Sequence, residues 1–182
     1  MVDEPSRLER EVRLHKRLRE LLLQFSSGLS TNLGLPAALE RLTPEIRDLA
    51  AARAVEIWLH DRRKGELYQA ATSQSRTSTA RVSVNDSGHY AASGLRLDRP
   101  RFAGPYLLVP LRGWRRALGT LVIERSERVA GPSHTPPRRG AQGGDFDDAE
   151  FLEFGRELAR QLSVGIENVL LLDDVLRQNV LD

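Results

Sequence analysis

Residues 106–124 read YLLVPLRGWRRALGTLVIE, and this stretch decides the fold class. Two apolar runs, at 106–111 and 118–124, flank a turn that holds glycine, tryptophan and three arginines. Apolar runs joined by a short polar turn are typical of a β-hairpin. Pro110 has no amide hydrogen to donate, so it predicts an edge position or a bulge in the first strand. The sequence therefore predicts an antiparallel hairpin in the second half of the chain.

Two amphipathic helices are predicted before any strand. Apolar side chains recur every three or four positions over residues 6–29, where Ser6 and Glu9 can form a capping box. The same periodicity returns over residues 36–52, and Pro36 suits the first turn of a helix. Each segment has one apolar side that the rest of the fold must cover.

The apolar period then changes from three or four residues to two. Alternation predicts a half-buried strand at 55–59, and residues 66–72 return as its hairpin partner. A weaker strand is predicted at 79–84. The polar, glycine-rich stretch that follows predicts a short helical turn near 90–93 and a strand at 95–97.

One long helix closes the chain. Asp147 and Glu150 form a second capping box, and apolar residues then recur every three or four positions from Phe151 to Val180. A stripe on the order of 30 residues is longer than an ordinary globular helix. Its distal half is therefore expected to pair with something outside the domain. The whole order predicts an α+β fold, with an antiparallel sheet and the N- and C-terminal helices packed on one side.

Three stretches of the chain resemble the GAF family of regulatory domains. LLVPL and LGTLVIE, at 107–111 and 118–124, resemble the central hairpin of that family. FDDAE at 146–150 resembles the start of its last helix, and LARQL with IEN, within 158–168, resembles the end of that helix. PAS domains share the architecture but usually place their helices between strand pairs. The short, polar centre of this chain favours GAF.

The resemblance divides the chain into an N-terminal amphipathic coiled-coil helix (1–34), a GAF domain (35–168) and a C-terminal signalling-helix extension (169–182). It implies a non-catalytic sensory domain of a bacterial signalling protein. Such a domain would form a homodimer and relay a signal to an output domain, for example a histidine kinase or a transcription regulator, downstream or in a partner protein. A ligand-free structural dimerisation module is the alternative. The predicted dimer contacts are Leu14, Leu18, Leu21, Phe25, Val169, Leu172, Leu176 and Val180.

The resemblance also implies a small-molecule site between the sheet and the central segment, here residues 83–106. Several polar side chains there could converge on an effector. A polar loop without a ligand is the other interpretation. The chain lacks the Asn-Lys…Phe…Asp-Glu pattern of cyclic-nucleotide-binding relatives. The candidate ligand-binding residues are Ser83, Asn85, Asp86, Ser87, His89, Tyr90, Arg96 and Arg101.

Cysteine is absent from the chain, which excludes disulfides, thiolate metal sites and a cysteine nucleophile. The absence also excludes cysteine-linked chromophores and the cysteine chemistry of GAF-fold methionine sulfoxide reductases. The four histidines have no metal-ligand spacing, and no Ser-His-Asp frame or phosphate loop is recognisable. The sequence therefore predicts a protein that is not an enzyme and has no metal or cofactor, while noncovalent haem or flavin stays open.

The formal charge of +2 is unevenly spread, with +8 over residues 35–144 and −7 over 145–182. Nearly all cations are arginines, with Lys16 and Lys64 the only lysines. This bias indicates genome composition rather than phosphate contact, so no nucleic-acid partner is expected. The sequence has no apolar run of about 18 residues, as a membrane helix needs, and no secretory signal. A cytoplasmic protein without a membrane partner is predicted.

Overall fold

A six-stranded antiparallel sheet runs through the middle of the molecule. The structure, a computed structural model, describes residues 4–30, 34–74, 79–126 and 148–180. The strands are β1 (Ala52–Asp61), β2 (Glu66–Thr72), β3 (Arg81–Ser83), β4 (Arg101–Ala103), β5 (Tyr106–Arg112) and β6 (Ala117–Arg125). They pair in the order β3-β2-β1-β6-β5-β4. The two predicted hairpins, β1–β2 and β5–β6, are thus confirmed, and they join through β1 and β6 at the centre of the sheet.

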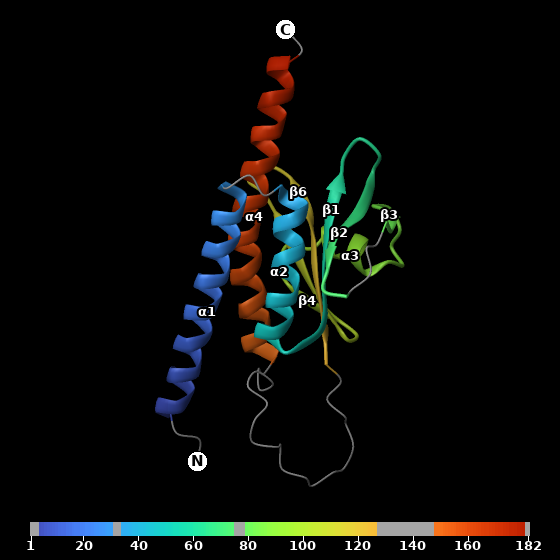
Figure 1. The fold of residues 1–182 in the computed structure, drawn as a ribbon. Helices are drawn as coiled ribbons and strands as arrows, with labels where there is room; N and C mark the ends of the chain where they lie inside the picture. The colour runs from blue at the N-terminus through green and yellow to red at the C-terminus, as the bar shows by residue number, and fades with distance from the viewer. Residues whose placement is uncertain (1–3, 31–33, 75–78, 127–147, 181–182) are drawn as a thin grey trace.

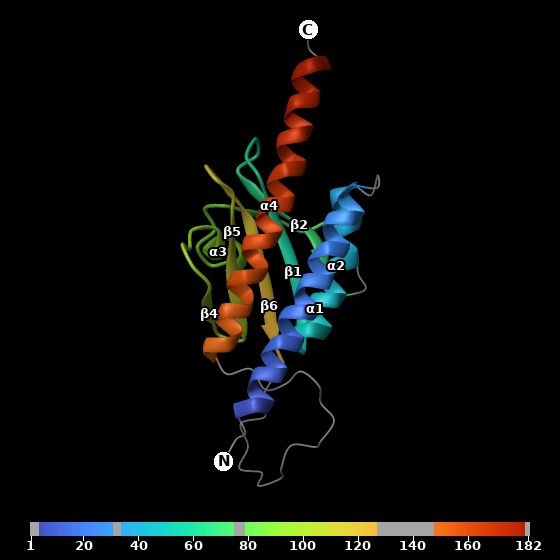
Figure 2. The same cartoon turned by 90° about the vertical axis from the view of Figure 1, so that its left-hand side faces the viewer.

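Three helices cover one face of this sheet and one short helix covers the other (Figures 1 and 2). They are α1 (Glu4–Ser30), α2 (Leu35–Ala50), α3 (Tyr90–Leu95) and α4 (Asp148–Val180). α2 lies on β1 and β2, α4 lies on β5 and β6, and α1 packs on the outside of α2 and α4. α3 lies on the opposite face, against β5 and β6. The predicted α+β fold, with the N- and C-terminal helices on one side, is confirmed.

The sheet is buried on both of its faces. Val55, Ile57 and Leu59 of β1 are at most 3% exposed, in the core beneath the helices. Trp58 points to the opposite face, where it is 2% exposed in a second apolar cluster with α3. The prediction of a half-buried strand is therefore wrong at Trp58. The reason is that the segment carrying α3 folds over this face.

The short elements around β5 explain two local features. The pairing of β4 stops at Leu108, so Pro110 lies beyond the end of β4, at a local edge of the sheet. The predicted edge position of this proline is thus confirmed. The predicted strand at 95–97 is wrong, because Leu95 ends α3 and β4 is the strand that pairs with β5. Across the described ranges, no helix is long and apolar enough to cross a membrane.

Candidate functional site

The predicted ligand-binding segment folds around α3 on the second face of the sheet. His89 caps α3, with its Nδ1 accepting the amide hydrogen of Ala91 at 3.1 Å. The ring of Tyr90 stacks between His89 and Tyr106, with centroid separations of 4.3 and 4.7 Å. The indole of Trp58 meets His89 and Tyr90 edge-on, at 5.2 and 6.4 Å. We call Trp58, His89, Tyr90 and Tyr106 the aromatic cluster.

A single carboxylate of β1 binds two members of the aromatic cluster. Oε2 of Glu56 accepts hydrogen bonds from Oη of Tyr90 at 2.8 Å and from Nε1 of Trp58 at 3.0 Å. Burial raises the pKa of Tyr90 above its ordinary value, and the hydrogen bond to Glu56 and nearby negative charges raise it further. At neutral pH, Tyr90 is therefore a hydrogen-bond donor and not a base.

α3 sits directly on β6 because small residues line their contact. Ala91, Ala92 and Gly94 are buried there, and Oγ1 of Thr120 donates to the carbonyl oxygen of Ala91 at 2.8 Å. A Cβ on Gly94 would lie 2.3 Å from Cγ2 of Thr120, so glycine is required for this approach. The chain's own residues thus fill the sheet face beneath α3, where the family resemblance implies a ligand.

The other predicted ligand residues are Ser83, Asn85, Asp86, Ser87, Arg96 and Arg101. Side-chain oxygens of Ser83 and Asp86 accept amide hydrogens in the turn before α3, at 3.2 and 3.0 Å. Arg96 donates to the carbonyl oxygen of Val84 at 3.1 Å, and Arg101 is exposed on β4. These contacts order the loop that carries α3. Ligand binding by these residues stays a prediction.

The variant Tyr90→Phe tests the link between α3 and β1. It removes the hydrogen bond to Glu56 and is expected to lower the free energy of unfolding by about 1 kcal/mol at pH 8. The folded pKa of Tyr90 is raised, so its stabilising contribution is complete below the unfolded pKa of about 10 and is lost as pH rises above it. Urea unfolding at pH 8 and 11 should therefore show a smaller alkaline loss in Tyr90→Phe than in the wild type. The neighbouring variant Tyr106→Phe should keep the larger loss; equal losses in all three proteins would contradict the prediction.

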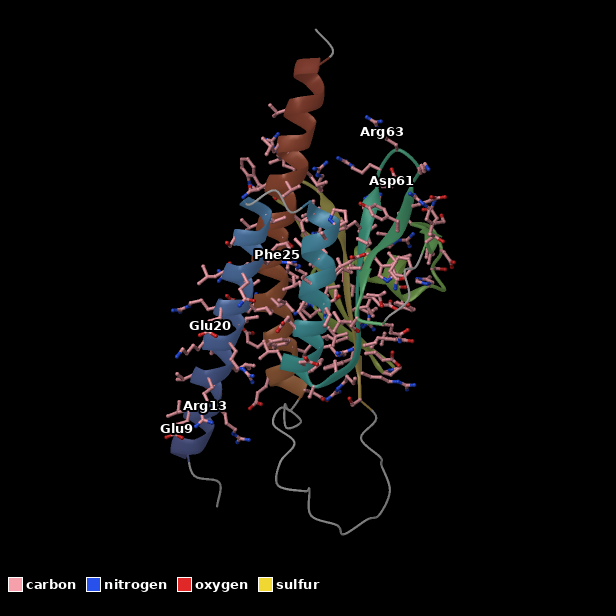
Figure 3. All side chains as sticks on the ribbon, in the orientation of Figure 1. Glu9, Arg13, Glu20, Phe25, Asp61 and Arg63 are labelled. Atoms are coloured by element: carbon pink, nitrogen blue, oxygen red, sulfur yellow. The ribbon has the colours of Figure 1, made fainter. Side chains whose placement is uncertain are left out.

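The predicted dimer contacts divide into buried and exposed side chains. Leu18, Leu21 and Phe25 are at most 7% exposed because they join the core of their own chain; Figure 3 labels Phe25 on α1. Leu14 and Val169 are half-buried at the rim of this core. Leu172 is 60% exposed. The side chains of Leu176 and Val180 lie outside the described residues.

α4 carries a second apolar stripe on the side away from the core. Val164, Leu171 and Val175 are 58, 50 and 52% exposed. Together with the exposed Asn168 they follow the 4-3-4 spacing of a coiled-coil seam. We call Val164, Asn168, Leu171 and Val175 the outer stripe. Sequence analysis missed the outer stripe because the buried stripe of α4 has the same period. The two stripes can be told apart in the sequence because they are offset by about half a helical turn.

Another carboxylate ties the β5–β6 turn to α4. Both oxygens of Glu167 accept the amide hydrogen of Trp114, at 2.9 and 3.1 Å. A Cβ on Gly113 would lie 2.7 Å from that carboxylate, so a larger residue there would displace the end of the Glu167 side chain. A displacement of this turn would therefore act on α4 at Glu167, one residue before Asn168 of the outer stripe.

Solved structures with this arrangement include GAF domains and an enzyme. The GAF domain of an Acinetobacter phosphoenolpyruvate-protein phosphotransferase is 15% identical, with a TM-score of 0.62 over 86% of this chain and 97% of that one. The second GAF domain of DevS from Mycobacterium smegmatis is 21% identical, with a TM-score of 0.53 over 79% and 98%. A free methionine-R-sulfoxide reductase from Neisseria meningitidis is 18% identical, with a TM-score of 0.59 over 85% and 91%. No protein-family model and no curated protein sequence matches the chain.

The chain therefore has a GAF-like fold. The predicted resemblance is confirmed at the level of the fold. Because one of these neighbours is a reductase, the fold alone does not separate binding from catalysis. Within the part of the chain that the structure describes, no three histidine, aspartate or glutamate side chains are grouped as metal ligands.

Proposed function

We propose that this chain is a non-catalytic regulatory domain that forms a parallel homodimer through its terminal helices and relays a signal along α4. The observation that carries the proposal is the outer stripe. α4 has apolar side chains on two opposite sides, and its own chain covers only one of them. An apolar helix side that stays in water is unfavourable, at about 25 cal/mol for each Å² exposed.

A second copy of the chain suits the outer stripe better than an unrelated partner. The stripe has heptad spacing, which is the pattern by which identical helices pack side by side. Asn168 lies between Val164 and Leu171, and a polar asparagine within such a seam selects one register by pairing with its own copy. That pairing occurs when the two helices are parallel and in register. Both copies of α4 would then leave the domain at the same end.

Parallel helices give the domain a way to pass a signal. α4 is 33 residues long, about 50 Å, and its C-terminal part extends beyond the sheet (Figure 1). A small molecule or protein that favours one helix packing over another would shift the populations of the two. The output domain would be a histidine kinase or a transcription regulator in the bacterial cytoplasm, downstream of α4 or in a partner protein.

Sedimentation and cross-linking together test the dimer and its orientation. Analytical ultracentrifugation of the chain at about 10 and 100 μM is expected to show a dimer, because packing of two outer stripes removes their apolar side chains from water. The chain contains no cysteine, so Val175→Cys introduces a single thiol. In parallel, in-register helices the two thiols are neighbours and should form a disulfide under mild oxidation.

Two results would contradict this proposal. A monomer at both concentrations, with its helix content intact by circular dichroism, would exclude the dimer. A dimer in which Val175→Cys gives no disulfide would exclude the parallel arrangement. Trp114→Cys serves as the control, because its side chain is 85% exposed on the β5–β6 turn and lies outside the outer stripe.

A ligand-free structural dimerisation module is the second candidate function. The aromatic cluster and the close contact between α3 and β6 favour it, because both occupy the face where an effector would bind. Thermal-shift screening against nucleotides, amino acids and haem separates the two functions. A stabilising ligand whose effect is lost in Tyr90→Phe would support sensing at this face. No shift with any of these compounds would support the structural module.

A further inference from the structure

A cationic hollow lies at the end of the sheet from which α4 continues toward the C-terminus. Its volume is about 610 Å³, and it is lined by the β1–β2 turn, by Arg81, by residues 116–118 and by Leu170 of α4. Figure 3 shows Asp61 and Arg63 on the β1–β2 turn at this end of the molecule. The hollow is open to solvent, and its volume lies within the range of about 300–1,000 Å³ that small-molecule sites span. We call this space the basic hollow.

One of the cations in the basic hollow is neutralised by its neighbours. Nη1 of Arg81 lies 3.3 Å from Oδ2 of Asp61 and 3.3 Å from Oε2 of Glu66. Desolvation raises the pKa of Asp61, but hydrogen bonds from Arg81 and from turn amides outweigh it and hold this pKa below its usual value. Asp61 is therefore charged at neutral pH, and Arg81 pairs with both acidic groups.

Four further cations have no acidic partner among the described residues. They are Arg62, Arg63 and Lys64 in the β1–β2 turn and Arg116 at the end of the β5–β6 turn. Like charges that lie within a Debye length of about 8–10 Å repel one another. The four side chains line one hollow, and a bound anion would offset their charge. Sequence analysis ascribed the arginines to genome composition, because no sequence pattern shows that the β1–β2 and β5–β6 turns line one hollow.

His60 adds an unpaired polar atom to the same space. Nδ1 of His60 is buried and has no hydrogen-bond partner in the part of the chain that the structure describes, and the residue lines the basic hollow. A buried polar atom without a partner costs about 1–3 kcal/mol. Because this atom has almost no accessible surface, it is a local cost to the folded chain and adds no contact for a ligand.

We propose that the basic hollow binds a small anion that carries two or more phosphate charges. The planar guanidinium groups of Arg62, Arg63 and Arg116 can each donate two parallel hydrogen bonds to phosphate oxygens, and Lys64 adds a compact charge. The site is separate from the aromatic cluster, none of whose residues lines it. Leu170 lines the hollow, and Glu167 anchors the turn that leads to Arg116. A bound anion would therefore act on α4 where that helix leaves the sheet.

Isothermal titration calorimetry with sodium pyrophosphate tests the site on the full chain. Saturable binding at one site per chain is expected, and it should persist when sodium chloride replaces part of the buffer at constant ionic strength. The double variant Arg63→Gln with Arg116→Gln is expected to raise the dissociation constant at least about tenfold, because it removes two of the four unpaired cations. The matched control is Arg41→Gln with Arg99→Gln, which removes the same charge from exposed positions outside the hollow and should leave the constant unchanged.

Several results would overturn the proposal. Absence of binding at millimolar pyrophosphate would do so. Equal weakening of pyrophosphate binding in the two double variants would also do so, because it would show that binding depends only on the overall positive charge of the chain. Citrate that binds as tightly as pyrophosphate would exclude a phosphate site, and tighter binding of a short duplex oligonucleotide would assign the arginines to nucleic acid. Sedimentation of the same samples reports the dimer separately.

Discussion

Replacing Gly119 by alanine is expected to cost about 3 kcal/mol of folding free energy, near the upper end of what overpacking usually costs. Gly119 lies opposite Leu59, where β6 pairs with β1 at the centre of the sheet. A Cβ there would lie 1.9 Å from the carbonyl oxygen of Trp58 and 3.0 Å from Cα of Leu59. Both obstacles are backbone atoms, so the clash is relieved only if the central strand pair separates.

Urea unfolding followed by far-ultraviolet circular dichroism measures this loss at a fixed chain concentration. For a loss of 3 kcal/mol, the midpoint should fall by about 1.5 M, given an ordinary denaturant slope. Gly28→Ala is the matched control, because a Cβ there meets nothing within 4 Å and α1 gains an alanine. It should be neutral or stabilising by about 0.5–1 kcal/mol. An unchanged midpoint in Gly119→Ala would show that β1 and β6 do not approach each other so closely.

The double variant Val164→Glu with Leu171→Glu is expected to convert the proposed dimer into a monomer. Each chain would place two carboxylates in the seam, so four like charges would lose water and face one another. A rise of the dissociation constant by at least 100-fold corresponds to about 2.8 kcal/mol, which is modest for such a change. Sedimentation velocity over about 1–100 μM should show the shift.

The fold should survive this double variant, because both side chains are at least half exposed in the single chain. An unchanged circular dichroism spectrum is therefore part of the expected result. Trp114→Glu places one carboxylate on an exposed apolar position outside the outer stripe and should leave the dimer intact. A double variant that still sediments as a dimer would show that another surface joins the two chains.

The hairpins and the long helices were predictable because their periods repeat over many residues. The runs at 106–111 and 118–124 lie within β5 and β6, whose observed ends are at most one residue further out on each side. β3 and β4 have three residues each, too few for a period, and only pairing with β2 and β5 defines them. Trp58 looked solvent-facing because its burial depends on α3, which follows more than 30 residues later.

The candidate site was predictable as a region but not as a set of contacts. The segment around His89 and Tyr90 was singled out by the family resemblance. Tyr90, however, reaches back to Glu56, on the face of β1 that alternation had assigned to solvent. No local pattern connects those two positions. On α4, two apolar stripes with the same period overlap in the sequence. Only the packing of the core shows that Ile166 is buried and that Val164 is exposed.

The continuity of α4 has a consequence for any protein that is joined to its end. An α-helix turns by about 100° for each residue, so the direction in which a fused module faces is set by the number of residues between them. Seven added residues return the module to within about 20° of its first direction, whereas two added residues rotate it by about 200°. The number of residues between α4 and a fused module therefore sets how that module is oriented about the helix axis. We expect working fusions to recur at intervals of seven residues.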